Sequence, residues 1–311
     1  MMQLLYLNFT AISKDEDSYK AMMSQLELAL KNKDLSPESV FSDSLTNTIY
    51  GHEARYAPMS LNTLKGVNYD RILQIWKERY ASPGQFVYYF IGNFDEATLR
   101  PLIEKYIGCL PKGKAENWKE TPAYATGKLE NKFTRKSETP KAIAFEQWFA
   151  PMPYTVENDV LTDAAGQVLS MVYLKNIRED ASAAYSVSAG GLLQRRGDKA
   201  YALIQTFCPM DPNKSDLALK LLAEGMKENC EKMDADKVQK VKDFMLKQAE
   251  LSAKSNSHWM DVIDEYVWTG IDFQSGYKAA VEALTPAKIT AYLKKLVSAG
   301  NHAEVVMTPA K

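Results

Sequence analysis

Arg178 and Tyr185 are the two side chains whose types and setting point most clearly to chemistry. Hydrophobic periodicity predicts that a long helix ends near Arg178, that a short turn of small residues follows, and that Tyr185 enters a strand. A guanidinium and a phenol are both hydrogen-bond donors at neutral pH, so together they could stabilise an oxyanion that develops on a carbonyl. The alternative is structural, with an arginine that balances the helix dipole and a half-buried tyrosine.

The rest of the sequence contains no complete catalytic or metal-binding motif. The three histidines, His52, His258 and His302, lie far apart, and no HxxEH or HExxH pattern joins one of them to a second ligand. The three cysteines are also widely separated and form no CxxC pair, which excludes a zinc ribbon or a disulfide framework. No GxSxG, P-loop or GxGxxG sequence occurs. We therefore expect this chain to bind no metal and no cofactor of its own.

Composition excludes several classes of protein. The chain has 311 residues, of which 46% are hydrophobic and 25% are charged, as in globular domains and unlike disordered or fibrous chains. Its 38 basic and 39 acidic residues leave a net charge of −1, so no excess of positive charge favours binding to nucleic acid. No apolar stretch approaches the roughly 18 residues of a membrane-spanning helix.

The elements that must position Arg178 and Tyr185 are predicted from periodicity and from turn residues. Strands are expected at 4–11, 86–91, 141–149, 184–192, 200–207 and 302–307. Helices are expected at 14–31, 36–49, 68–80, 96–107, 156–180, 213–232, 236–253, 256–268 and 286–298. Ser13, Asn68 and Thr285 are expected to cap the helices that follow them, and Pro286 is expected at the first helical position of the last one. This order is typical of the α+β class, with mostly antiparallel sheets that carry helices on one face.

The order of elements repeats along the chain. A strand, a capped helix, further helices and a final strand occur over 4–91 and again over 201–307. We predict two homologous α+β domains, 1–112 and 126–311, joined by a polar, lysine-rich linker at 113–125. The second domain opens with a strand, a long helix and another strand that the first one lacks. The first domain is therefore expected to be truncated at its front, as in a fragment.

Four segments, in the same order along the chain, resemble the pitrilysin/insulinase family of zinc metallopeptidases. Residues 79–95, RYASPGQFVYYFIGNFD, are similar to a helix–strand segment of that family, and the loop 51–58 is similar to its YG…R…P loop. Residues 102–111, LIEKYIGCLP, resemble its L.EKYLGSLP ending. The sequence IRE at 177–179, followed by YSV at 185–187, resembles its RE…YSV motif. The resemblance is greatest to bacterial members with two homologous halves in one chain.

The resemblance implies that this chain is the C-terminal, non-catalytic portion of a zinc metalloendopeptidase. In that family one half holds zinc with HxxEH and a downstream glutamate, and the other half supplies an arginine and a tyrosine seven residues apart. Arg178 and Tyr185 have this spacing. They are therefore expected to reach the substrate carbonyl and the oxyanion, while zinc is expected in a catalytic half outside this chain. The chain alone is expected to be inactive.

The resemblance also implies two partners. One is the catalytic HxxEH half, in the same polypeptide or as a separate subunit, and the other is an unfolded peptide enclosed between the halves. It suggests a periplasmic location, because bacterial relatives of this type are often periplasmic. Two other functions stay open at this point, namely an inactive relative that acts as a scaffold subunit and a stand-alone peptide-binding module. No nucleic-acid partner and no membrane-spanning segment are expected.

Overall fold

The computed structural model describes residues 1–114, 116 and 124–310, which divide into two compact units. The first unit comprises Met1–Asp34 and Met59–Lys119, and the second comprises Leu35–Pro58 and Glu120–Lys311. The linker predicted at 113–125 falls largely on residues outside the described part of the chain. The helix predicted at 36–49 contributes to the second unit, although it precedes the linker in sequence.

The first unit consists of helices in its described residues. They are α1 (Met2–Thr10), α2 (Glu16–Asn32), α4 (Leu61–Lys65), α5 (Tyr69–Tyr80) and α6 (Glu96–Ile103), with a π-helical segment at Glu104–Gly108 and 3-10 turns at Lys33–Leu35 and Pro83–Gln85. The side chain of Asp15 caps α2 by accepting a hydrogen bond from the N–H of Ser18. The side chain of Asn68 caps α5 in the same way, as the sequence predicts.

Two strands predicted for this unit, at 4–11 and 86–91, are wrong. The first segment forms helix α1, which begins with methionine, glutamine and leucine, all good helix formers. The second forms no strand, although Phe86 has an extended backbone. A strand needs a hydrogen-bonded neighbour, and the described part of this unit holds none. The ring of Phe9 instead lies 5.0 Å from that of Tyr80 and 5.2 Å from that of Phe86.

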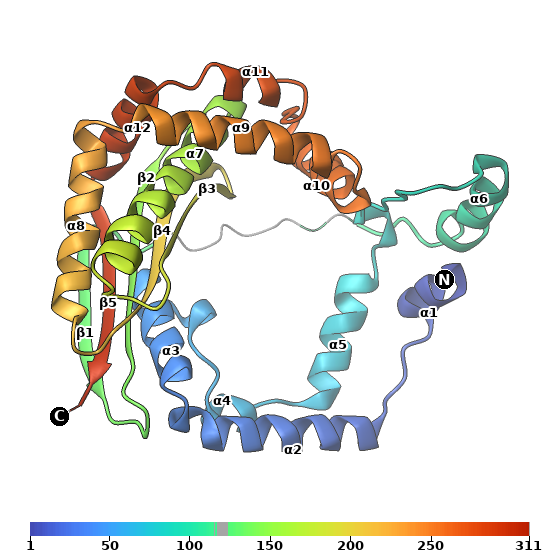
Figure 1. Cartoon of the computed structure of the whole chain (residues 1–311). Coiled ribbons are helices and arrows are strands. Elements are labelled where there is room, and N and C mark those ends of the chain that lie inside the picture. Colours follow the sequence, from blue (N-terminus) through green and yellow to red (C-terminus); the bar gives the residue numbers. More distant parts are fainter. Residues whose placement is uncertain (115, 117–123, 311) are drawn as a thin grey trace. The chain divides into compact units, whose positions relative to one another are not determined.

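The sheet of the described residues lies in the second unit, which corrects the prediction of one sheet in each domain. Its order is β1-β5-β2-β4-β3, with β1 parallel to β5 and all other neighbours antiparallel (Figure 1). The strands are β1 (Lys128–Arg135), β2 (Ala142–Pro151), β3 (Ser188–Arg196), β4 (Lys199–Met210) and β5 (Asn301–Pro309). The α+β class and four of these strands confirm the sequence prediction, which missed β1. The prediction that Tyr185 enters a strand at 184–192 is wrong, because β3 begins at Ser188 and Tyr185 lies in the bend before it.

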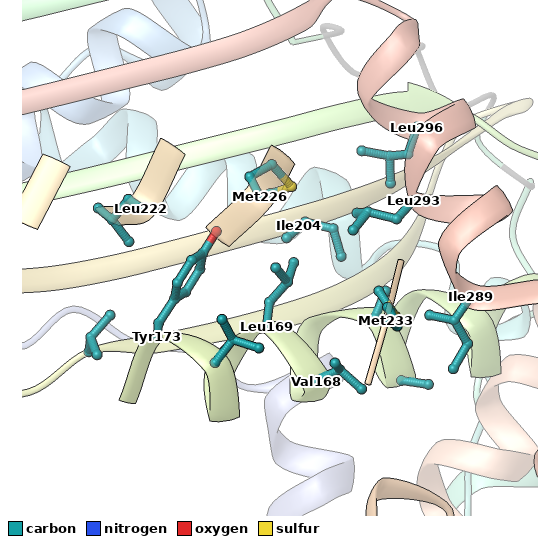
Figure 2. Close-up of a cluster of buried hydrophobic side chains, with 14 of the residues drawn as sticks. Val168, Leu169, Tyr173, Ile204, Leu222, Met226, Met233, Ile289, Leu293 and Leu296 are labelled. Atoms are coloured by element: carbon teal, nitrogen blue, oxygen red, sulfur yellow. The ribbon is translucent and has the colours of Figure 1, made fainter. Parts of the chain in front are cut away.

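Helices α7 (Val156–Tyr173) and α12 (Pro286–Ser298) lie against one face of this sheet, and three further helices pack around α7. These are α8 (Ser215–Glu231), α9 (Ala235–Ser252) and α11 (Tyr277–Glu282), while α10 (Asn256–Thr269) follows α9. Leu169, Ile204, Leu222 and Leu293 are fully buried in the resulting core (Figure 2). Each such side chain contributes about 1.5–3 kcal/mol to folding. Within the described residues, no helix has the length and apolar character needed to cross a membrane.

Helix α7 approaches β3 through two glycines. A Cβ atom on Gly191 would lie 1.8 Å from the carbonyl oxygen of Thr162, and one on Gly166 would lie 2.1 Å from the backbone nitrogen of Gly191. Any larger residue would therefore push the helix away from the strand. This contact sets the height of α7 above the sheet, and with it the position at which the helix ends near Arg178.

The opposite face of the sheet is partly covered by α3 (Pro37–Ile49). Phe41 of α3 is buried against Ile143 of β2, and the side-chain amide of Asn131 in β1 donates hydrogen bonds of 2.9 Å to the hydroxyls of Ser44 and Thr48. Helices therefore lie on both faces of the sheet, whereas the sequence predicts them on one. The reason is that α3 has its own apolar stripe, which this unit buries.

Arg196 at the end of β3 connects the loop after α3 to the sheet. Its guanidinium donates hydrogen bonds to the hydroxyls of Tyr50 at 2.8 Å, Tyr56 at 3.1 Å and Tyr124 at 3.0 Å. It also lies 4.2 Å from the centre of the Tyr124 ring, and the rings of Tyr50 and Tyr56 stack at 3.8 Å. Charge-assisted hydrogen bonds and cation–π contacts of this kind hold the loop against the strand.

Candidate functional site

Arg178 lies where α7 changes its helical geometry. The side chain of Thr155 caps the start of α7, and the helix continues past Tyr173 into a π-helical segment, Leu174–Asp180. This confirms the long helix predicted at 156–180. Ile177 is fully buried, while the next residue, Arg178, is exposed. Single π-helical turns are frequent at functional sites, because the wider turn redirects side chains.

The turn between Arg178 and Tyr185 is anchored to the end of β4 by backbone hydrogen bonds. The N–H of Tyr185 donates to the carbonyl of Pro209 at 3.1 Å, and the N–H of Asp211 donates to the carbonyl of Ala183 at 3.0 Å. The N–H of Ala183 in turn donates to the carbonyl of Ile177 at 2.8 Å. Helix end, turn and strand end are therefore tied together around Ala183, which is fully buried.

Lys214 and Ser182 complete this turn. Ser182 has a φ of 49°, in the left-handed region that residues with a side chain seldom adopt. The ammonium group of Lys214 donates hydrogen bonds to the carbonyls of Ala181 at 3.0 Å and Ser182 at 3.1 Å. A cation that satisfies two carbonyls stabilises the tight bend, so the backbone on both sides of it is fixed.

The side chains of both candidate donors are exposed on this fixed backbone. Tyr185 is 70% exposed, although Ala183 and Ala184 just before it are buried. Neither Arg178 nor Tyr185 makes a side-chain hydrogen bond or ion pair with another residue in the part of the chain that the structure describes. The alternative of a half-buried structural tyrosine is therefore wrong for Tyr185. Two unpaired donors on an ordered turn are available to a ligand.

The residues that the structure describes do not fit a zinc site. Among them, no group of three or more His, Cys, Asp or Glu side chains is placed to hold a metal ion. His52 is exposed in the turn after α3, Nε2 of His258 lies 3.0 Å from Oε1 of Gln274, and the ring of His302 stacks at 3.8 Å on that of Trp148. No chemical step is therefore assigned to a metal held by these residues.

A buried carboxyl group lies on the face of the sheet that α7 and α12 cover. Glu146 of β2 is 4% exposed and pairs in register with Glu304 of β5. Loss of solvation, followed by repulsion from Glu304, raises the pKa of Glu146 from 4.5 to about 7. Lys132 of β1 forms an ion pair with Glu304. The signal in the sequence is the one acidic residue of the predicted strand 141–149.

The sequence of this chain also matches a known family of proteins. The sequence matches the family described as "Peptidase M16 inactive domain" over residues 66–245, more than half of the chain. The chain belongs to this family. The matched segment contains Arg178, Tyr185 and the turn between them, and it confirms the resemblance to this group of zinc peptidases on which the sequence analysis rests.

Similar proteins are longer than this chain. A zinc protease PQQL-like protein of Arabidopsis thaliana is 22% identical over 284 residues, which cover 84% of this chain and 29% of that protein. The structure of the periplasmic protease PqqL from Escherichia coli has a TM-score of 0.79 at 20% identity, over 99% of this chain and 34% of the other. A peptidase M16 inactive domain from Pseudomonas fluorescens has a TM-score of 0.77 at 15% identity, over 100% of this chain and 75% of the other. The chain thus spans about a third of the first two proteins, and the structural likenesses show the fold alone.

Proposed function

We propose that this chain is the non-catalytic portion of a zinc metalloendopeptidase and closes a chamber around an unfolded peptide. Membership of the M16 inactive-domain family supports this, as do relatives named zinc proteases and a described chain without a metal-binding group. The required partner is a catalytic half with an HxxEH motif, in the same polypeptide or as a separate subunit, and zinc belongs to that half. A periplasmic location is part of the proposal, because the related PqqL is described as a periplasmic protease.

Arg178 and Tyr185 are the residues that the chain contributes to the reaction. The guanidinium of Arg178 polarises the scissile carbonyl through a charge-assisted hydrogen bond. The hydroxyl of Tyr185 donates a hydrogen bond to the same oxygen as it becomes the oxyanion of the tetrahedral intermediate. The observation that carries this proposal is an exposed Tyr185 without a side-chain partner, on a backbone fixed by hydrogen bonds. A donor on a fixed backbone needs less reorganisation during the reaction than one on a mobile segment.

The substitution Arg178→Gln tests this role. We expect it to lower kcat/KM about 10²-fold for an unfolded fluorogenic peptide, measured with the chain and its HxxEH half together, because a charged donor to the carbonyl is lost. Lys175→Gln is the matched control. Lys175 is a second exposed cation of the same π-helical segment, and it pairs with Asp180 at 3.0 Å. Its removal is expected to change the rate by less than about twofold, since exposed ion pairs contribute little.

The two variants together separate a specific contact from a general charge effect. A large loss in Arg178→Gln with an unchanged Lys175→Gln supports the contact with the carbonyl. Equal losses in both would mean that any cation on this segment acts by its charge alone. An unchanged rate in Arg178→Gln would remove Arg178 from the mechanism and favour the alternative of a scaffold subunit.

A further inference from the structure

The strand β3 is an edge strand of the sheet, so one side of its backbone is unpaired. Only two residues separate Arg196 from its register partner Lys199. The residue pair that flanks a two-residue hairpin turn is hydrogen-bonded. Along the two strands, hydrogen-bonded pairs then alternate with pairs that are not hydrogen-bonded. The N–H and C=O groups of every second residue from Arg195 back to Ala189 therefore face away from β4. No strand of the described chain lies beside them.

A pocket of about 370 Å³ is lined by residues of α7, α9 and β3, beside this unpaired edge. Figure 1 shows these three elements close together. Among the lining side chains are Gln167 and Met171 of α7, Lys240 and Phe244 of α9, and Ala189 of β3. Phe244 is 52% exposed, although a large aromatic side chain normally lies inside a folded protein. The pocket is therefore lined by apolar side chains together with the polar side chains of Gln167 and Lys240.

We propose that the edge of β3 binds an extended peptide segment, which pairs with the strand and inserts a large apolar side chain into this pocket. A row of unpaired backbone groups accepts an added strand, and alternate side chains of that strand point to the same side of the sheet. Because Ala189 lines the pocket, this side is the face that α7 covers. The other side chains would lie on the opposite face, where Leu192 is 49% exposed and a Cβ on Gly190 would meet nothing within 4 Å.

The pocket favours a foreign peptide over a second copy of this chain. On the face that α7 covers, β3 itself presents Ala189, Gly191 and Leu193. Leu193 is only 4% exposed, since it belongs to the core beneath the helices of the same chain. A second copy of β3 would therefore bring no large free side chain to the pocket. Binding at this edge uses neither Arg178 nor Tyr185, so the inference stands independently of the proposed catalytic role.

The apolar part of the proposal is tested with the 311-residue chain and a fluorescein-labelled, unstructured peptide of about ten residues with a central phenylalanine. Fluorescence anisotropy gives its Kd. Phe244→Ala is expected to raise the Kd by about tenfold or more, because it removes one wall of the pocket. Leu251→Ala is the matched control, since Leu251 lies on the same helix with 51% exposure and does not line the pocket. It is expected to change the Kd by less than about twofold.

The backbone part is tested by Ala189→Pro, which removes an outward N–H and leaves the pairing with β4 intact. We expect a Kd at least about tenfold higher with an unchanged thermal unfolding midpoint. Should this variant fail to fold, two peptides that are N-methylated at alternate amides replace it. Only the peptide whose methyl groups lie on the amides that face β3 should lose binding. This binding assay uses the chain without a catalytic half and measures no hydrolysis, so a failure here is distinct from a failure of the catalytic role.

Several results would overturn the proposal. One is that this peptide binds no more tightly than the same peptide with serine in place of its central phenylalanine. Another is that Phe244→Ala binds the peptide as tightly as the parent protein does, or that neither Ala189→Pro nor N-methylation of the peptide weakens binding. A third is that the chain elutes as a dimer in size-exclusion chromatography and that Ala189→Pro converts it to a monomer. That result would assign the edge of β3 to a second copy of the chain.

Discussion

Tyr185→Phe is expected to lower kcat for peptide hydrolysis by about 10²–10³-fold in the assembled enzyme, while KM changes little. The phenol donates a hydrogen bond that becomes strong only when the carbonyl oxygen gains negative charge, so its loss affects the transition state more than the bound substrate. The substitution removes one oxygen and keeps the ring. It leaves intact the backbone hydrogen bond from Tyr185 to Pro209, which holds the turn.

Tyr266→Phe provides the control for this measurement. Tyr266 lies on α10 and is 57% exposed, so its hydroxyl resembles that of Tyr185 in access to solvent but belongs to another element. Its removal is expected to leave kcat unchanged. A loss of less than about threefold in Tyr185→Phe would take this residue out of the mechanism. A loss that appears entirely in KM would mean that Tyr185 binds the substrate and does not stabilise the oxyanion.

Glu146→Gln is expected to stabilise the protein by about 3 kcal/mol at pH 8 and by less than about 1 kcal/mol at pH 5. The pKa of Glu146 is about 7 in the folded state, against 4.5 for an unperturbed carboxyl. Between these values the folded protein binds a proton more tightly than the unfolded chain does. The stability that depends on this proton is therefore present at acid pH and is lost as the pH rises through about 7. Glutamine stays neutral and carries no such cost at pH 8.

Urea unfolding of both proteins at the two pH values measures this difference. Glu130→Gln is the control, because Glu130 also lies on the sheet, in register with Glu304, but is exposed. A hydrogen bond from Lys128 lowers the pKa of Glu130, so no stabilisation at pH 8 is expected from this substitution. If Glu146→Gln stabilised the protein equally at pH 5 and pH 8, this would contradict a raised pKa of Glu146.

Local signals predict most of the longer helices of this chain, although α1 is predicted as a strand and the short helices α4 and α11 are missed. Asn68 and Thr285 cap the helices that the sequence assigns to them, and Pro286 occupies the first turn of α12. The start of α2 is less accurate, because Asp15 caps it where the sequence favours Ser13. Both residues carry a suitable oxygen, and the choice between them depends on the path of the chain before the helix.

The strands are harder to predict because each one depends on its neighbour. The segment 86–91 has the aromatic and β-branched residues of a buried strand, yet its unit offers no strand to pair with in the described residues. The missed strand β1 has the opposite character. Its charged residues alternate with Leu129 and Phe133, which is the pattern of a half-buried strand, and β5 provides the hydrogen bonds. The domain boundaries at 112 and 126 stay predictions.

The candidate site is predictable in residue type but not in setting. The types and spacing of Arg178 and Tyr185 can be read from the sequence, and so can the end of a helix between them. The exposure of Tyr185, the bend at Ser182 and the support from Lys214 depend on contacts between segments that are distant in sequence. The same holds for the pocket beside β3, whose lining residues come from three separate elements.

Peptide hydrolysis and zinc content, measured together on the chain alone and on the chain with an HxxEH half, test the central claim most directly. We expect no zinc and no hydrolysis from the chain alone, and hydrolysis once the catalytic half is present. One zinc ion per chain with activity of the chain alone would contradict this account and reveal a metal site within the chain. An HxxEH half that is equally active with and without this chain would also contradict it, because nothing in the reaction would then depend on Arg178 or Tyr185.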